Sequence, residues 1–229
     1  MADRIIQTEE LTKIANAIRS NTPSNDPHYS PIQVNQFWSK IAQAILTEKG
    51  GLVSGEATEF EIPYGVTSIR TDCFKSLTKL STIYIPPTVT EIKYHGISYN
   101  SGLKVLHIPG TVTTLENGAV YRNEELLQLI LDEGITSLPY EFAYYCQKLP
   151  QITIPETCKS IGQSAFESCF SLELINIKAY DMTSIGNNAF RLIKSTAVIN
   201  CAFSQGDVSG APWGAPNTVT INYDVNFNS

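Results

Sequence analysis

The sequence predicts an α+β repeat fold, a solenoid of about six 23-residue coils with a helical hairpin before it and a β cap after it. Three observations predict this fold. Aliphatic residues recur every 23 positions through the middle of the chain, the first 50 residues show helical periodicity instead, and the last segment leaves the interval for an alternating pattern. We therefore expect a hairpin over residues 1–50, repeats over 51–200 and a C-terminal cap over 201–229.

The interval of 23 residues holds over six consecutive aliphatic positions, which are Ile62, Ile85, Ile108, Leu131, Ile154 and Ile177. A leucine column with the same spacing consists of Leu80, Leu103, Leu126, Leu149 and Leu172. One unit of this length cannot bury its own apolar face, whereas stacked units share a continuous core. Each inward Leu or Ile then contributes about 1.5–3 kcal/mol when fully buried. The last unit is one residue longer, which places an insertion near Tyr180–Asp181.

Within a unit, the pattern L-x-x-I-x-I-P predicts a short strand whose isoleucines point inward and whose intervening residue points outward. The proline ends the strand because it has no N–H to offer a neighbouring strand. A second short extended piece follows, such as "VTEI" or "VTTL". The pattern G-x-x-A-F, at Gly162–Phe166 and Gly186–Phe190, then predicts a helical or tight turn whose phenylalanine fills the convex side.

These motifs carry a family resemblance. The segment "IPETCKSIGQSAFESCFSLELINI" (154–177) resembles the BspA-like leucine-rich repeats, in which a Leu-containing strand is followed by "IP", "V-x-x-I-G" and "A-F-x-x-C". The resemblance covers roughly residues 56 to 200 and implies a right-handed leucine-rich-repeat solenoid. The segments "ENGAVYRN" and "PYEFAYYC" depart from the pattern, so the convex surface is expected to differ there.

Residues 1–50 predict two amphipathic helices. The first follows Thr8 as N-cap, and the second begins with Ser30 as cap and Pro31 at the first helical position and ends at Gly50–Gly51. This hairpin is either the N-terminal cap of the solenoid or a module for attachment and oligomerisation. In the second case its interface consists of Ile14, Ile18, Phe37, Trp38 and Ile41.

Both ends also resemble a second group of proteins. The motif "E-L-T-x-I-A-x-A-I-R" (10–19) is similar to N-terminal segments of tail and baseplate proteins of phages that infect Gram-positive bacteria. The C-terminal "APWGA…INY" resembles endings of repeat proteins encoded in such phages and prophages. In that segment the alternating Val219, Ile221 and Tyr223 predict a final strand that closes the last coil.

The composition argues against several classes. The formal charge of −6 argues against a nucleic-acid binder, which normally has a basic face. The first ten residues do not have the pattern of a secretory signal, and no apolar run reaches the length of a membrane span. Five cysteines without a CxxC pair favour reduced, buried thiols, with Cys146 and Cys169 in one column. The three histidines are not spaced, relative to each other or to the cysteines, as metal ligands usually are. We therefore expect no metal and no other cofactor.

No catalytic motif occurs, so the chain is expected to be non-enzymatic. Two surfaces are candidates for binding a protein or a glycan. The first is the outward column of the strands, which consists of Tyr84, His107, Ile130, Thr153 and Asn176. The second is a group of tyrosines on the turns, which alternatively pack between coils: Tyr94, Tyr99, Tyr121, Tyr140, Tyr144 and Tyr145.

From these features we expect a structural or recognition protein of a phage or prophage tail. It would be made in the host cytoplasm, incorporated in the virion, and would bind other virion proteins or the host envelope. A homo-oligomer held together by the N-terminal helices is a further expectation. The alternative is a bacterial cell-surface module of the BspA type that serves adhesion and protein–protein interaction.

Overall fold

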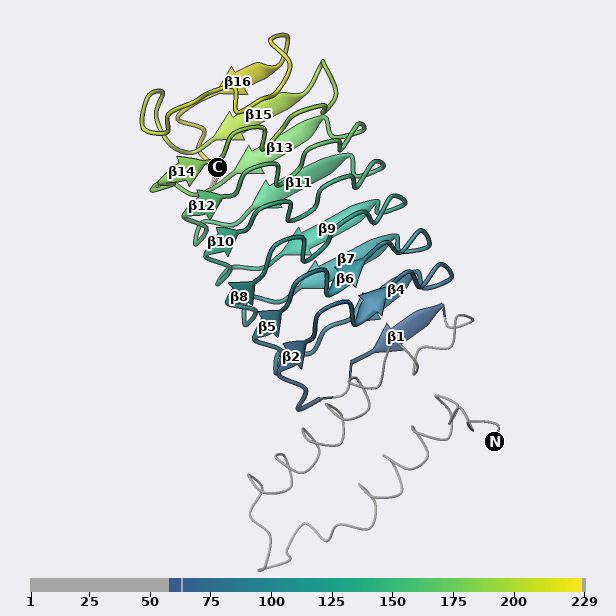
Figure 1. Cartoon of the computed structure of the whole chain (residues 1–229). Coiled ribbons are helices and arrows are strands. Elements are labelled where there is room, and N and C mark those ends of the chain that lie inside the picture. Colours follow the sequence, from purple (N-terminus) through teal and green to yellow (C-terminus); the bar gives the residue numbers. More distant parts are fainter. Residues whose placement is uncertain (1–57, 63, 228–229) are drawn as a thin grey trace, which may run out of the picture.

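The computed structural model describes residues 58–62 and 64–227 as a parallel β-solenoid of about seven turns (Figure 1). The long face carries two four-stranded sheets. They are β1 (Glu59–Glu61), β4 (Thr82–Tyr84), β7 (Val105–Ile108) and β9 (Gln128–Leu131), then β11 (Gln151–Ile154), β13 (Leu174–Ile177), β15 (Val198–Cys201) and β16 (Thr220–Asn222).

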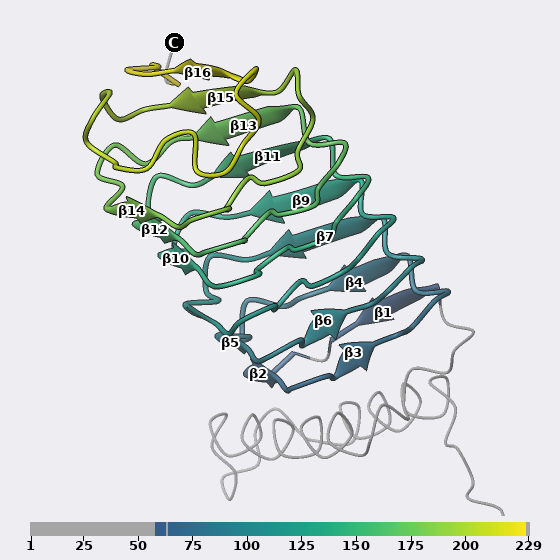
Figure 2. The same ribbon diagram turned by 45° about the horizontal axis from the view of Figure 1, so that its top comes forward.

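The short face carries two three-stranded sheets of two-residue strands. They are β2 (Ser68–Ile69), β5 (Glu91–Ile92) and β8 (Thr114–Leu115), then β10 (Ser137–Leu138), β12 (Ser160–Ile161) and β14 (Ser184–Ile185). Each coil then returns through a third side, which we call the turn edge. Among the described residues, β3 (Phe74–Lys75) and β6 (Ile97–Ser98) are the only segments of this side that pair as strands (Figure 2).

The register confirms the repeat. All strand pairs are parallel, and Phe60 pairs with Ile83 and Leu106 with Leu129, so each residue pairs with its counterpart in the next repeat. Buried side chains therefore stack on their counterparts, and the predicted leucine column from Leu80 to Leu172 is almost completely buried. The predicted insertion is also present, because Ile161 pairs with Ile185, one position beyond the regular interval.

Prolines shape the corner after the long face. Val89 N–H donates to the Pro86 carbonyl, and Val112 N–H donates to the Pro109 carbonyl, each at 3.0 Å. These bonds close a turn directly after the strand. Because the proline has no backbone N–H to donate to the neighbouring coil, the chain leaves the sheet there.

A proline also separates the two sheets of the long face. In the coils on either side of it, Leu127 N–H donates to Lys104 O and Glu173 N–H donates to Pro150 O. Pro150 occupies the equivalent position between them and has no N–H to donate to Leu127. The strand pairing is interrupted at this coil, between β9 and β11.

The predicted α+β class is wrong. The described residues contain sixteen strands and no helix. The G-x-x-A-F segments form turns. Ser164 within the first of them and Ser168 just after it adopt positive φ of 55° and 63°. Two left-handed residues four positions apart reverse the chain repeatedly, so helical hydrogen bonding cannot propagate. Phe166 is buried as expected.

The predicted ends have different outcomes. The helical hairpin over residues 1–50, with its interface residues Ile14, Ile18, Phe37, Trp38 and Ile41, lies outside the described residues. At the other end the expected final strand is present as β16, which pairs with β15 through Thr220, Ile221 and Asn222.

A buried polar column supports the turn edge from inside. Asn123 accepts a bond from Asn100 N–H at 3.0 Å and donates to the carbonyls of Ile97 and Val120, each at 3.0 Å. In the next two coils Cys146 and Cys169 occupy the same position, and their Sγ atoms donate to Val120 O and Ala143 O at 3.4 and 3.3 Å. Asn and Cys here satisfy backbone groups that the turn leaves unpaired within the core.

We predict that Asn123→Ala lowers the free energy of unfolding by at least about 2 kcal/mol. Asn100 N–H and Ile97 O lose their partner, and Val120 O retains only the weak donor Sγ of Cys146. Urea denaturation followed by circular dichroism measures the change. Asn117→Ala, an exposed position on the same coil, is the matched control and should change stability by less than about 0.5 kcal/mol. Equal effects of the two substitutions would contradict the role of the buried column.

Candidate binding surfaces

The first candidate surface is the outward column of the long face. The register pairs His107 with Ile130, and Thr153 with Asn176, so these side chains follow one another across the strands. Tyr84 is 51% exposed and Ile130 is 37% exposed. The alternating burial of the strands keeps this column on the solvent side, as the period of two requires.

The long face changes character along its length. Its first half presents Tyr84, Ile130 and the exposed His107, whose Nε2 lies 2.8 Å from Asp132 Oδ1 in the next coil. In its second half Asn200 Nδ2 donates to Asn176 Oδ1 at 2.9 Å, and Asn222 Nδ2 donates to Asn200 Oδ1 at 2.8 Å. In this amide ladder the side chains hydrogen-bond to one another, so fewer amide donors and acceptors remain for a ligand.

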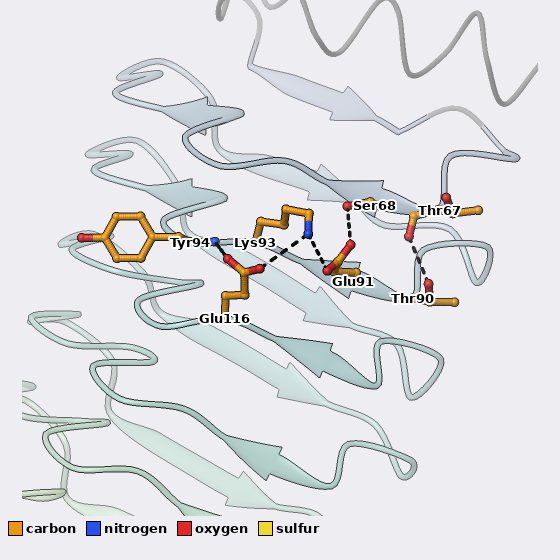
Figure 3. Close-up of polar contacts among 7 residues, drawn as sticks. All are labelled: Thr67, Ser68, Thr90, Glu91, Lys93, Tyr94 and Glu116. Atoms are coloured by element: carbon orange, nitrogen blue, oxygen red, sulfur yellow. Dashed lines mark hydrogen bonds and ion pairs between the residues drawn. The ribbon is translucent and has the colours of Figure 1, made fainter.

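Polar side chains join consecutive coils on the short face (Figure 3). Lys93 Nζ lies 2.7 Å from Glu91 Oε1 and 3.5 Å from Glu116 Oε1, and Ser68 Oγ donates to Glu91 Oε2 at 3.0 Å. The hydrogen bond from Lys93 lowers the pKa of Glu91. Glu116 Oε2 also accepts the backbone N–H of Tyr94 at 2.8 Å, and the Tyr94 ring points away from the charged pairs. This contact fixes the backbone where the second candidate surface begins.

The second candidate surface runs along the turn edge, and we call it the aromatic row. Its members are Tyr94, His95, Tyr99, Tyr121, Tyr144, Tyr145 and Phe170. Tyr94 stacks on His95 with ring centroids 3.9 Å apart, and His95 stacks on Tyr121 at 4.7 Å. Tyr121 and Tyr144, which occupy equivalent positions in neighbouring coils, stack at 5.1 Å with an angle of 9° between their planes. The row then continues through Tyr145 to Phe170.

Arg122 lies beside the row, between two of its tyrosines. Its guanidinium carbon is 5.7 Å from the centre of the Tyr99 ring and 4.4 Å from that of Tyr145. These three residues occupy one position in three successive coils, so the register itself places the cation between the two rings. Such contacts are worth about 0.5–1 kcal/mol each at exposed sites.

Exposure divides the predicted tyrosines into two groups. Tyr121, Tyr144 and Tyr145 are half-buried and pack between coils, which was the expected alternative for part of the set. Tyr94 and Tyr140 are 47% and 43% exposed. Tyr99 is also on the exposed side, so these three side chains are available to a partner.

Sequence reasoning missed three components of this surface, namely His95, Arg122 and Phe170. For Arg122 a signal existed, because it lies one repeat interval from both Tyr99 and Tyr145. Phe170 is 45% exposed and belongs to the turn after the G-x-x-A-F pattern, where the repeat prescribes no residue type. His95 looked like an isolated histidine because its stacking depends on the left-handed turn at that position, where its φ is 53°.

His95 is the buried titratable group of the row, with 9% of its surface exposed. Its Nδ1 lies 4.0 Å from Asp72 Oδ1, and Gly118 lies against its ring, where a Cβ would come within 2.5 Å of Cδ2. Burial lowers the pKa of His95, and the charge of Asp72 opposes that change only in part. The folded structure therefore favours the neutral imidazole.

The described residues also include all five cysteines and histidine and acidic side chains, which commonly bind metal ions. None of the five cysteines forms a disulfide, and burial raises the pKa of Cys146 to about 12 and that of Cys73 to about 11. No three His, Cys, Asp or Glu side chains of residues 58–62 and 64–227 lie close enough to hold a metal ion. The same part of the chain has no helix with the length and apolarity needed to cross a membrane.

Short parallel strands stacked at a constant interval, with leucine and isoleucine columns inside, define a leucine-rich-repeat solenoid. The family model described as "BspA type Leucine rich repeat region (6 copies)" matches residues 53–145 and 121–206. The chain belongs to this BspA-type leucine-rich repeat family.

A solved structure shows the same fold. It is a leucine-rich repeat protein from Eubacterium ventriosum, 19% identical with a TM-score of 0.56, over 76% of this chain and 45% of that one. One from Bacteroides ovatus is 21% identical with a TM-score of 0.48, over 79% and 55%. A leucine-rich cell surface protein from Faecalibacterium prausnitzii is 19% identical with a TM-score of 0.38, over 76% and 61%. The chain thus spans about half the length of the first two proteins. A comparison with curated proteins found no match.

We predict that the free energy of unfolding falls as the pH is lowered through about 6.5, and that His95 is responsible for part of this fall. The unfolded chain binds the His95 proton more tightly than the folded chain does, so protonation favours unfolding. Urea denaturation at about pH 7.5 and about pH 5.5 compares the wild type with His95→Asn and His95→Gln. Both variants should show a smaller loss of stability on acidification, and an unchanged loss would contradict the assignment.

Proposed function

We propose that this chain is a non-enzymatic interaction module that binds a partner protein through the aromatic row at the turn edge. The observation that supports it is a continuous aromatic surface, with Tyr94, Tyr99 and Phe170 exposed along its length and Tyr140 exposed beside it. Exposed aromatic side chains in such a group are enriched at binding sites and dominate the energy of association.

Rigidity supports the same proposal. The half-buried Tyr121 and Tyr144 stack on one another, and Arg122 lies between Tyr99 and Tyr145. Side chains that are held in place before binding lose little conformational entropy when a partner arrives. The stacked rings thus act as a platform for the more exposed residues around them.

The stacking also favours a protein over a glycan as the partner. Tyr121 and Tyr144 cover each other's faces, since their planes are within 9° of parallel. Such rings present edges and hydroxyl groups to the outside, whereas a sugar ring stacks on an open aromatic face. Tyrosine edges and hydroxyls suit the mixed apolar and polar contacts of protein interfaces.

The long face is the weaker candidate. Its second half is the self-paired ladder of Asn176, Asn200 and Asn222, and its exposed apolar side chains in the first half are Tyr84, Val105 and Ile130. It nevertheless provides a matched control, because these positions are as exposed as those of the aromatic row.

A non-enzymatic role is supported by the state of the reactive groups. Thiols whose pKa is raised by burial are poor nucleophiles, and His95 is enclosed by its aromatic neighbours.

The setting that we propose is a bacterial cell surface. The family match covers the repeats, and residues 1–52 and 207–229, which carry the resemblance to phage tail proteins, lie outside it. The comparisons therefore support the cell-surface alternative of the two roles expected from the sequence and give no support to the virion.

To test the binding surface, Tyr94, Tyr140 and Phe170 are replaced together by serine. Binding to a panel of purified extracellular proteins is measured by biolayer interferometry with the full chain immobilised. We expect at least about a tenfold loss of affinity for any protein that the wild type binds. The denaturation midpoint should change little, because these side chains are largely exposed.

The matched control is Tyr84→Ser with Ile130→Ser on the long face, which should retain wild-type affinity. Loss of binding in this control but not in the triple variant would move the site to the long face. The assay is repeated with enzymatically deglycosylated partners, and binding that disappears with the glycan would contradict a protein partner.

The setting has its own test. Intact cells of the native bacterium are treated with protease, and the chain is followed by immunoblotting beside a cytoplasmic marker. We expect loss of the chain while the marker survives. Protection equal to that of the marker would contradict display at the cell surface.

A further inference from the structure

The last strand of the long face has one partner in the described structure. β16 pairs with β15 through Thr220, Ile221 and Asn222, and among the described residues no strand lies on its other side (Figures 1 and 2). An edge of this kind presents unpaired backbone N–H and C=O groups to a further strand.

Apolar side chains lie beside this edge. Ile221 stands in the inward column that contains Ile175 and Ile199, both fully buried, yet Ile221 itself is only partly buried. Val219 and Tyr223, two residues to either side, are also partly buried hydrophobic residues. The core column therefore ends in a partly uncovered apolar surface.

Within the strand itself, the usual protection against pairing is missing. Natural edge strands are commonly blunted by lysines, other charges, proline or a bulge. Residues 217–223, "NTVTINY", contain none of these residue types, although the chain as a whole has a formal charge of −6. The flanking Pro216 and Asp224 lie outside this segment, so an approaching second copy meets no charged side chain within the strand itself.

We propose that β16 pairs antiparallel with β16 of a second copy of this chain, about a two-fold axis that passes beside Ile221. In this register Ile221 lies opposite the same residue of the other copy, and opposed residues point to the same face. The two partly uncovered isoleucines then cover each other and extend the core column from one molecule into the next.

The polar residues of the strand fit the same register. Thr220 of one copy lies opposite Asn222 of the other, and both are exposed. Asn222 uses its amide nitrogen on Asn200, so its carbonyl oxygen remains suited to accept a hydrogen bond from the threonine hydroxyl. The two-fold axis creates this threonine–asparagine pair twice. The strand is thus complementary to itself, which a closed two-fold dimer requires.

The test uses the full chain in sedimentation velocity over a concentration series. We expect a concentration-dependent dimer for the wild type and a monomer for Ile221→Lys and for Ile221→Glu, because each places like charges directly opposite one another. Thr153→Lys, an exposed position on β11, is the matched control and should dimerise as the wild type does.

Mixing the Ile221→Lys and Ile221→Glu variants should restore a heterodimer, because the opposed residues then attract. Restoration also shows that neither variant lost association through unfolding, which circular dichroism checks independently. A wild type that stays monomeric at every concentration, filaments or higher oligomers in place of dimers, a dimer insensitive to Ile221→Lys, or a mixture that stays monomeric would each overturn the proposal.

Discussion

The register between coils is the constraint on which the rest of this structure depends. Coils donate backbone hydrogen bonds to adjacent coils on all three sides, for example from Asp132 to Ile108 on the long face, from Glu116 to Ile92 on the short face and from Val120 to Phe142 on the turn edge. Because each turn brings the chain back to the same position around the axis and one strand spacing further along it, each inward position lies on its counterpart one coil away. The core is therefore a set of columns, and a residue is tolerated inside only if it suits its column. The extra residue in the coil after Ile177 is accommodated because both faces resume pairing in a register shifted by one position.

The same register builds the surface. Tyr121 and Tyr144 stack because they occupy one outward position in neighbouring coils, and Arg122 lies between Tyr99 and Tyr145 for the same reason. On the long face it aligns Asn176, Asn200 and Asn222 into a ladder. In a solenoid, equivalent outward positions of successive coils lie side by side. A residue type that recurs at one such position therefore forms a continuous stripe on the surface. Where the repeat pattern is broken by tyrosines, the stripe is the aromatic row.

What the sequence predicts best is what the register determines. The columns, the strands before each proline, the insertion and the buried Cys146 and Cys169 all follow from periodicity and burial. The class was wrong because G-x-x-A-F is compatible with a helical turn, and only the left-handed conformations at positions such as Ser164 and Ser168 exclude one. No side-chain pattern in the sequence predicts those conformations, which non-glycine residues adopt at some energetic cost. The contacts of His95 were unpredictable for the same reason, since the turn directs its ring. The interruption of strand pairing between β9 and β11 could have been predicted from the sequence, because Pro150 has no backbone N–H to donate.

Positions within a repeat therefore carry different kinds of information. At inward positions such as that of Asn123, the side chain is held by hydrogen bonds to two coils. The residue type there is therefore determined by stability and not by a binding partner. Outward positions are free to vary, and a departure from the repeat there needs another explanation. The half-buried Tyr121 and Tyr144 are explained by the contacts that they make between coils. Tyr94, Tyr140 and Phe170 are not, because each leaves more than two fifths of its surface in solvent. Exposed aromatic area of that size stabilises the fold little, and its recurrence along one edge is the feature on which the proposed binding surface rests.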